Sequence, residues 1–441
     1  MLLIGNGRLL TLAPDNPFQE EGAVAIEGDR IVAVGPTAEL QQRYPEAEWL
    51  DARGMVIMPG MTNTHMHLYS TFARGMALKD APPANFLEIL QRLWWRLDKA
   101  LTLEDVYYSA LIPLVDCIKS GTTTILDHHA SPRAVRGSLE MIARAARETG
   151  VRTCLAYEVS DRDGEAIMRE GIEENMAAIK KYRGQEGLLT ATFGLHASFT
   201  LSDATLAACR EAAAEVGSGF HIHVAEGIQD VEDALEREGK RVVERLYDHG
   251  ILGPETIAAH CVHVTEREIA ILKETGTLVV HNPESNMGNA VGCAPVGDML
   301  AAGVTVGLGT DGYTSDMFES LKTANVLRKL VSGDPNAGWT EVPAMVFENN
   351  RRILARFFPH PLGRLEPGAY ADVILVDYHA PTPLTAANWF GHLLFGFNGG
   401  LVDTTIIGGK VLMRERRLLH LDEAAIAARA QELAVKVWER F

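Results

Sequence analysis

From Met55 onward, the sequence repeats one pattern eight times: a short apolar run, a polar or histidine-bearing tip, and a long amphipathic segment. The runs are MVIMPGM, TTTIL, VRTCLAY, LLTATFGL, GFHIHV, TIAA, TLVV and VTVGLG. This alternation is typical of parallel β-strands joined by helices. Eight such units across about 300 residues favour an α/β fold of the (β/α)8 TIM-barrel type, and no GxGxxG follows the first run to indicate a nucleotide-binding open sheet.

The two ends of the chain have a different sequence pattern. Residues 1–56 contain short β-like runs separated by Gly, Pro and Asp, and similar runs return after residue 358 before a closing amphipathic helix. We expect 1–56 and 359–441 to build one composite β-sandwich with a C-terminal helix, and 57–358 to form the catalytic barrel. The alternative is that the flanks are two unrelated β decorations. Because the sequence has no repeat, low-complexity tract or flexible linker, we expect the sandwich to be packed rigidly on the barrel.

Composition narrows the class of partner. A chain of 441 residues that is 47% hydrophobic can bury a large core and a smaller one. The formal charge of −17 argues against nucleic acid and against anionic membrane surfaces as partners. The five cysteines are scattered and never spaced as CxxC, and no signal segment or apolar run of membrane-spanning length is present. These features predict a cytoplasmic protein that acts on a small molecule.

The expected strand ends carry most of the titratable groups that catalysis needs. They bear His65, His67, Asp127, His128, His129, Glu158, His196, His223, Glu226, His260, His281 and Asp311. Active sites of β/α barrels lie at these carboxyl ends, so we expect the site here. His65 and His67 have the two-residue spacing that turns both imidazoles to one side of a strand. Imidazole and carboxylate ligands suit zinc or ferrous iron and leave a coordination position for water.

Five motifs carry a family resemblance. PGMTNTHMHL, HVAE, AAHCVH, HNPESN and LGTDG occur in this order. With them the chain resembles, over essentially its whole length, the deaminase and chlorohydrolase branch of the amidohydrolase superfamily. Within that branch, AYEVSDRDG and GLHASFTLSD are most similar to the SsnA-type aminohydrolases found among purine-catabolism genes.

The resemblance implies a set of site residues. The implied metal ligands are His65, His67, His223 and Asp311, and the implied catalytic residues are Glu226, His260 and Asp311. His221 competes with His223 because the two also stand in HxH spacing. The family motif places a glutamate three residues after the ligand, which selects His223 and makes His221 a residue of the barrel wall.

Residues for substrate binding are less constrained by the sequence. The family uses the positions of His196 and His281 to line the pocket, although a histidine bonded to loop backbone would give the same pattern. Asp127, His128, His129 and Glu158 can reach a ligand or satisfy buried loop amides, and Arg162 can clamp a polar substrate edge or lie on the surface. For Trp94 and Trp95 we expect packing, with at most one ring facing the site, because neighbours on a helix face different ways.

Together these features predict one divalent ion, with zinc first and iron or manganese as alternatives. Superfamily members with two metals bridge them by a lysine, which the third and fourth runs lack. The predicted reaction is deamination of a purine- or pyrimidine-like ring by water that the ion activates. Asp311 takes the water proton, Glu226 acts as the general acid, and His260 orients the nucleophile or stabilises charge. The alternatives are opening of a cyclic amide or imide ring, and an inactive binding protein. The resemblance also makes a homodimer a reasonable expectation.

Overall fold

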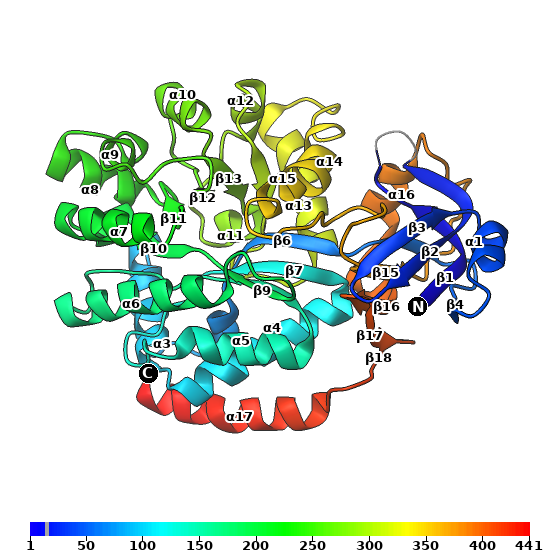
Figure 1. Ribbon diagram of the computed structural model, residues 1–441. Coiled ribbons are helices and arrows are strands. Elements are labelled where there is room, and N and C mark those ends of the chain that lie inside the picture. The colour runs from blue at the N-terminus through cyan, green and yellow to red at the C-terminus, as the bar shows by residue number, and fades with distance from the viewer. Residues whose placement is uncertain (14–16) are drawn as a thin grey trace.

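The computed structural model describes residues 1–13 and 17–441, and it confirms the predicted barrel (Figure 1). The barrel strands are β6 (Met61–Met66), β7 (Thr122–Asp127), β8 (Arg152–Leu155), β9 (Leu189–Ala191), β10 (Phe193–Ala197), β11 (Phe220–Val224), β12 (Ile257–His260), β13 (Leu278–His281) and β14 (Val306–Leu308). All neighbouring strands pair in parallel, from β6 to β9 and from β10 to β14. The run LLTATFGL is interrupted at Thr192, so that β9 pairs with β8 and β10 pairs with β11. The two together occupy the fourth position of an eight-unit barrel.

Helices surround the barrel, and one short helix among them lies at its mouth. They are α4 (Leu103–Ser120), α5 (Ser138–Thr149), α6 (Glu165–Tyr182), α7 (Asp203–Glu215), α8 (Ile228–Glu238), α9 (Val242–Asp248), α10 (Glu266–Thr275), α11 (Pro283–Gly288), α12 (Val296–Ala301), α13 (Met317–Ser332), α14 (Glu341–Pro343) and α15 (Asn350–Leu354). The connection after β6 adds η1 (Leu68–Ala73), α2 (Phe86–Ile89), the π-helical turn η2 (Leu90–Trp94) and α3 (Trp95–Ala100). No helix in the described part of the chain combines the length and apolar character needed to cross a membrane.

The buried amide of Asn350 helps to close the barrel between its first and last strands. Its Oδ1 accepts a hydrogen bond from the Leu308 amide at 2.8 Å, and its Nδ2 donates to the carbonyl oxygens of Thr62 at 2.8 Å and Leu308 at 3.0 Å. Nearer the carboxyl end, a single parallel bridge joins Met66 to Asp311. A side-chain amide thus satisfies backbone groups that the three-residue strand β14 leaves open.

The first apolar run contains a strand boundary that the sequence did not reveal. MVIMPGM was expected to be the first barrel strand, and this assignment is wrong for most of the run. Val56–Pro59 forms β5, which pairs with β1 and β15 of the flanking sheet, whereas the barrel strand begins at Met61. The chain passes from one layer to the other at Gly60, where a Cβ atom would lie 2.1 Å from Thr123 Oγ1. Both segments are fully buried, so no change of hydrophobic period marks the passage.

The two ends of the chain form one hydrogen-bonded sheet of nine strands beside the barrel (Figure 1). The strands are β1 (Leu2–Leu10), β2 (Phe18–Glu27), β3 (Arg30–Gly35), β4 (Glu48–Asp51), β5, β15 (Val373–Val376), β16 (Val402–Ile407), β17 (Lys410–Arg414) and β18 (Arg417–Leu418). The N-terminal and C-terminal parts meet where β5 lies between β1 and β15. Helices α1 (Thr37–Arg43) and α16 (Trp389–Gly396) belong to the same flanks.

The closing helix α17 (Glu423–Arg440) packs on the barrel. It runs along α4 from the end of the flanking sheet toward α3 (Figure 1). Its buried residues Ile426, Ala430, Leu433 and Val437 form one stripe of helical spacing, and the Trp438 indole donates to the Phe72 carbonyl at 2.7 Å. The helix therefore supports the connection that follows β6.

A buried ion pair fastens the flanking sheet to the barrel. Arg152 at the start of β8 donates from Nε and Nη2 to the two carboxylate oxygens of Asp372, at 2.8 and 3.0 Å. The same guanidinium donates to the Gly187 carbonyl at 2.6 Å and lies 3.7 Å from the ring centre of Tyr370. Arg152 and Asp372 are both buried, so the two layers share one fixed contact.

Candidate metal centre and active site

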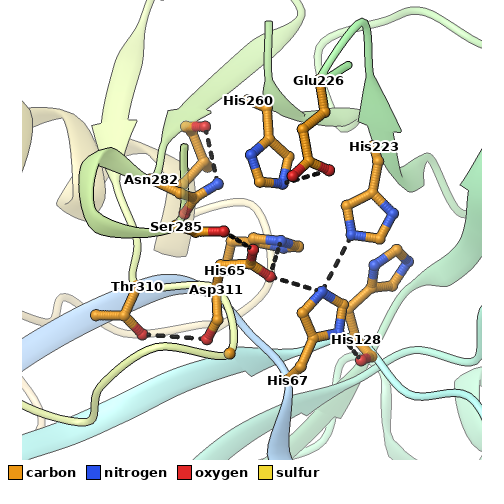
Figure 2. Close-up of polar contacts among 12 residues, drawn as sticks. His65, His67, His128, His223, Glu226, His260, Asn282, Ser285, Thr310 and Asp311 are labelled. Atoms are coloured by element: carbon orange, nitrogen blue, oxygen red, sulfur yellow. Dashed lines mark hydrogen bonds and ion pairs between the residues drawn. The ribbon is translucent and has the colours of Figure 1, made fainter. Parts of the chain in front are cut away.

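Three strand ends bring three imidazoles and one carboxylate together in the barrel mouth (Figure 2). His65 and His67 end β6, His223 lies in β11, and Asp311 follows β14. His67 Nε2 lies 3.1 Å from His223 Nε2 and 2.9 Å from Asp311 Oδ1, and His65 Nε2 lies 3.5 Å from the same oxygen. The structure thus places all four residues that the sequence singled out as ligands around one point.

Hydrogen bonds behind the rings determine which nitrogen faces that point. His67 Nδ1 donates to the His128 carbonyl at 2.5 Å, and His223 Nδ1 donates to the His196 carbonyl at 2.7 Å. Because a carbonyl oxygen only accepts, both Nδ1 atoms carry hydrogen, and in the neutral rings both Nε2 atoms present lone pairs. Two lone pairs 3.1 Å apart repel each other unless a proton or a metal cation lies between them.

His221 lies behind His65, the third imidazole of the set, and bonds to it. A His65 ring that offers its Nε2 lone pair carries its hydrogen on Nδ1, which lies 2.8 Å from His221 Nε2. His65 is fully buried, and its Nε2 has no hydrogen-bond partner among the described residues. The His221 ring stacks on His128 at 4.3 Å and does not reach Asp311, as expected for a residue of the barrel wall.

The charges around the four groups call for a cation. Burial lowers the pKa of His65 well below its usual value. Burial opposes protonation of His67 as well, but the charges and hydrogen bonds of Asp311 and Glu158 raise its pKa well above the usual value. Burial would raise the pKa of Asp311, yet the charge of His67 and the His65 imidazole 3.5 Å away hold it well below the usual value. Three imidazole nitrogens and a carboxylate around an orphaned Nε2 fit a divalent ion of the zinc type.

Glu226 and His260 form a second pair on the rim of this centre (Figure 2). Glu226 Oε2 lies 3.6 Å from His260 Nε2, and Glu226 Oε1 accepts from Asn289 Nδ2 at 3.3 Å. His260 Nδ1 donates to Asn286 Oδ1 at 2.8 Å, which leaves a lone pair on Nε2. Burial and then the charge of Asp311 raise the pKa of Glu226 to about 8, whereas burial lowers that of His260. At neutral pH the pair is a protonated carboxyl beside a neutral imidazole.

The backbone at these strand ends is strained. Ala225, His260, Cys261 and Asp311 have φ angles of 47°, 73°, 49° and 55°, in the left-handed region that non-glycine residues seldom adopt. Asp230 holds one of them, because its carboxylate accepts from the Ala225 amide at 2.9 Å. Such strain persists only where the surrounding structure imposes it, and it clusters at functional sites.

Helix α11 supplies residues that the sequence interpretation missed. Ser285 Oγ donates a short hydrogen bond to Asp311 Oδ2, Asn286 binds His260, and Asn289 donates both to Glu226 and to Ser285 Oγ at 3.2 Å. The motif HNPESN was noted for its histidine alone. Its buried Ser and Asn on a short helix that starts at a proline were the available signal.

The centre opens into a cavity that communicates with solvent. Glu158, His196 and Arg162 line it, as expected. Contrary to expectation, His128 and His281 do not line it. His128 is buried behind His67 and stacked on His221, while His281 faces a separate cavity beside α12 and α13.

The remaining candidates at strand two satisfy local groups. Asp127 accepts from the Leu68 amide at 2.9 Å, and His129 Nε2 lies 2.9 Å from Ser131 Oγ. Neither Asp127 nor His129 lines the cavity. The sequence left open whether these residues reach a ligand or satisfy polar groups of the loops. The structure shows that they satisfy polar groups of the loops.

Two tryptophans lie in the cavity wall. The interpretation that at most one of them faces the site is wrong, because Trp94 and Trp95 both line it. Trp94 meets Tyr69, which follows β6, whereas Trp95 meets His196 and Phe199, which end and follow β10. The two rings point in different directions. Because η2 and α3 lie between the ends of β6 and β10, both rings still face the cavity.

Comparison with known proteins agrees with this geometry. The model of the amidohydrolase family matches residues 56–412, and that of a bacterial imidazolonepropionase-like composite domain matches 22–47. A 5-methylthioadenosine/S-adenosylhomocysteine deaminase of Pelotomaculum thermopropionicum is 36% identical, over 100% of this chain and 99% of its own length. A 5′-deoxyadenosine deaminase of Methanosarcina mazei is 35% identical with the same coverage.

Solved structures show the same architecture. An adenosine deaminase from Xanthomonas campestris with bound zinc superposes with a TM-score of 0.87 at 27% identity, covering 99% of this chain and 98% of that one. An atrazine chlorohydrolase from Arthrobacter aurescens in complex with zinc shares the fold, with a TM-score of 0.84 at 24% identity and coverage of 98% and 100%. The chain therefore belongs to the amidohydrolase family and is a metal-dependent hydrolase of carbon–nitrogen bonds.

Proposed function

We propose that this enzyme deaminates a purine-type heterocycle, with adenine nucleosides as the first substrates to test. The observation that carries the proposal is the buried Glu226 carboxyl 3.6 Å from His260 Nε2 at the rim of the ligand set, where burial and Asp311 raise its pKa to about 8. Removal of an amino group from a ring requires a proton donor of this kind near neutral pH. The deaminase names of full-length relatives support the same reaction.

We propose His65, His67, His223 and Asp311 as the ligands of one ion, with zinc first and iron or manganese as alternatives. A divalent ion held there supplies Lewis-acid chemistry that lowers the pKa of water toward neutrality. The zinc present in two structural neighbours favours that ion.

Asp311, Glu226 and His260 then have separate roles in the reaction. Asp311 accepts a proton from the attacking water, whose oxygen bonds to the ring carbon that bears the amino group. Glu226 gives its proton to the neighbouring ring nitrogen, and His260 Nε2 accepts a hydrogen bond that orients the water. The departing amino group then takes the proton held by Asp311, and the new hydroxyl gives its proton to Glu226. Cleavage of the carbon–nitrogen bond releases ammonia, while the ring carbon becomes a carbonyl and the ring nitrogen keeps its proton.

The cavity suits a planar ring. Aromatic side chains from the connection after β6 and from the end of β10 form one wall, and they include Tyr69, Trp94, Trp95 and Phe199. Flat aromatic surfaces give a heterocycle stacking contacts, while Glu158 and His196 provide hydrogen-bonding groups beside them. A resemblance to purine-catabolism enzymes agrees with such a substrate.

Release of ammonia tests the proposal. Zinc-loaded enzyme should release it from adenosine, 5′-deoxyadenosine or 5′-methylthioadenosine. Glu226→Gln should lower kcat by about 10²- to 10⁴-fold without loss of metal. Glu284→Gln is the matched control, because Glu284 is also a largely buried acid with a raised pKa, of about 7, but it binds Ser320 away from the cavity. Formation of a carboxylate without ammonia from a cyclic amide or imide would replace deamination by ring opening.

A further inference from the structure

One ion pair lies in the cavity wall beside Trp95. Arg162, from the loop after β8, donates from Nη2 to Asp98 Oδ2 of α3 at 3.0 Å. The side chains of Arg162 and Asp98 are only 9% and 2% exposed. The guanidinium also lies 5.0 Å from the Trp95 ring, and its Nε donates to Ser160 Oγ at 3.0 Å. The arginine is thus fixed in place and already paired.

The charge of the cavity is otherwise acidic. Among the described residues that line it, Arg162 is the only lysine or arginine, whereas the carboxylates are Asp98, Glu158, Glu226, Asp230 and Asp311. Glu226 faces His260 at the rim of the ligand set, and Asp311 belongs to the proposed ion. Asp98 and Glu158 then outweigh the one guanidinium in the wall around the ion pair.

Three polar atoms in this part of the wall have no hydrogen-bond partner among the described residues. They are Arg162 Nη1, Asp98 Oδ1 and Trp95 Nε1, and all three are buried. Two of these atoms are donors and one is an acceptor. Buried polar atoms are normally satisfied, so a ligand or water is expected to meet them. Neutral groups that both donate and accept, such as hydroxyls and amides, match this set.

We propose that the Asp98–Arg162 pair makes the enzyme selective for substrates in which the group that meets this pair is neutral and hydrogen-bonding. This inference rests on the proposed deamination and narrows its substrate class. An anionic group there would meet two carboxylates and a cation that is already neutralised. Like charges brought together in a desolvated site oppose binding strongly.

Two ligands of similar size separate the possibilities: adenosine and adenosine 5′-carboxylate. Their kcat/KM values on zinc-loaded wild type, with ammonia release as the assay, should favour adenosine by about tenfold or more. Asp98→Asn removes the partner charge and frees the guanidinium. It should shift the ratio toward the carboxylate by about tenfold or more, through KM for the carboxylate rather than kcat. Asp98→Glu, which can keep the pair, should retain the preference of the wild type.

Asp163→Asn is the matched control. Asp163 is the neighbour of Arg162 and binds Lys99, the neighbour of Asp98, at 2.8 Å, but it does not line the cavity. This variant removes a carboxylate from the adjacent ion pair between the same two segments and should leave the ratio unchanged. A similar shift in Asp163→Asn would overturn a specific role for the pair.

Dissociation constants keep the inference distinct from the proposed reaction. They are measured for both ligands by calorimetry on zinc-loaded Glu226→Gln, with and without Asp98→Asn. Preferential binding of adenosine with no ammonia released by wild type would refute deamination and still support the charge selectivity. Equal affinity for the two ligands, or an unchanged ratio in Asp98→Asn, would overturn the selectivity. Failure to bind either ligand would overturn both.

Discussion

Ser285→Ala tests whether helix α11 orients the carboxylate of the proposed metal centre. Ser285 Oγ donates to Asp311 Oδ2, while Oδ1 of the same carboxylate faces His67 Nε2 at 2.9 Å. Ser285 is 1% exposed, so little room exists for water to take the place of the hydroxyl. The substitution leaves one carboxylate oxygen without this donor and frees the side chain to rotate. Asn289 also loses a partner, which loosens its bond to Glu226.

The expected size of the effect follows from these contacts. A hydrogen bond to a charged group contributes about 1.5–3 kcal/mol. If that stabilisation is lost in the transition state, kcat/KM falls by about 10- to 150-fold, since each 1.36 kcal/mol is tenfold in rate. The loss should lie mainly in kcat, because Ser285 acts through Asp311. Steady-state kinetics on protein of measured zinc content would detect it, and zinc content should remain close to one per chain.

Ser320→Ala provides the matched control. Ser320 also donates to an acid of α11, Glu284, but on the side that faces α13. It removes a serine–carboxylate bond from the same helix without touching the site, so its kcat/KM should match the wild type. A loss below about threefold in Ser285→Ala, or an equal loss in Ser320→Ala, would refute the orienting role.

Three further changes test other parts of the structure. His65→Ala should abolish activity and metal binding. His221→Ala should keep the metal with about 10- to 100-fold lower affinity, as metal titration can measure. Full metal occupancy and turnover in His65→Ala would refute the ligand assignment. Glu226 acts in its protonated form, so kcat/KM should decline as the pH rises through its pKa of about 8, and a profile that stays flat to high pH would contradict that role. Arg152→Met should lower the free energy of unfolding by about 3–5 kcal/mol in urea melts, because it leaves Asp372 buried and unpaired. The double variant with Asp372→Leu should recover much of that loss, and simple addition of the two single losses would contradict the account.

The barrel could be predicted because each apolar run ends in a polar tip and is followed by an amphipathic segment. The errors arose where the chain stays apolar across a change of layer. Val56–Pro59 and Met61–Met66 are both fully buried, so only the tight approach of Gly60 to Thr123 marks the passage from sheet to barrel. Helix α17 is similar, since its apolar stripe would fit a sheet or a barrel equally well. Periodicity reports that a face is buried and gives no information about its partner.

The proposed ligand set could be predicted for a related reason. Alternation on a strand places His65 and His67 on one side, and their position at a strand end places them in the mouth. The same alternation also admits His221, which lies one step deeper in β11 and bonds to His65 from below. The support from α11 could not be predicted, because Ser and Asn near helix ends usually cap turns. Only the closed barrel brings Ser285 to Asp311.

Backbone strain explains why residue types alone do not define this site. His260 and Asp311 adopt left-handed φ angles, a conformation that costs about 1–3 kcal/mol at a non-glycine residue. Glycine would remove the cost but also the imidazole and the carboxylate. The chain therefore keeps these side chains, and hydrogen bonds to the same residues offset the cost of the strain. Asn286 bonds to His260, and the His65 carbonyl accepts from the Asp311 amide at 3.0 Å. The direction in which each group enters the mouth is a property of these bonds, and they join segments that are far apart in the sequence.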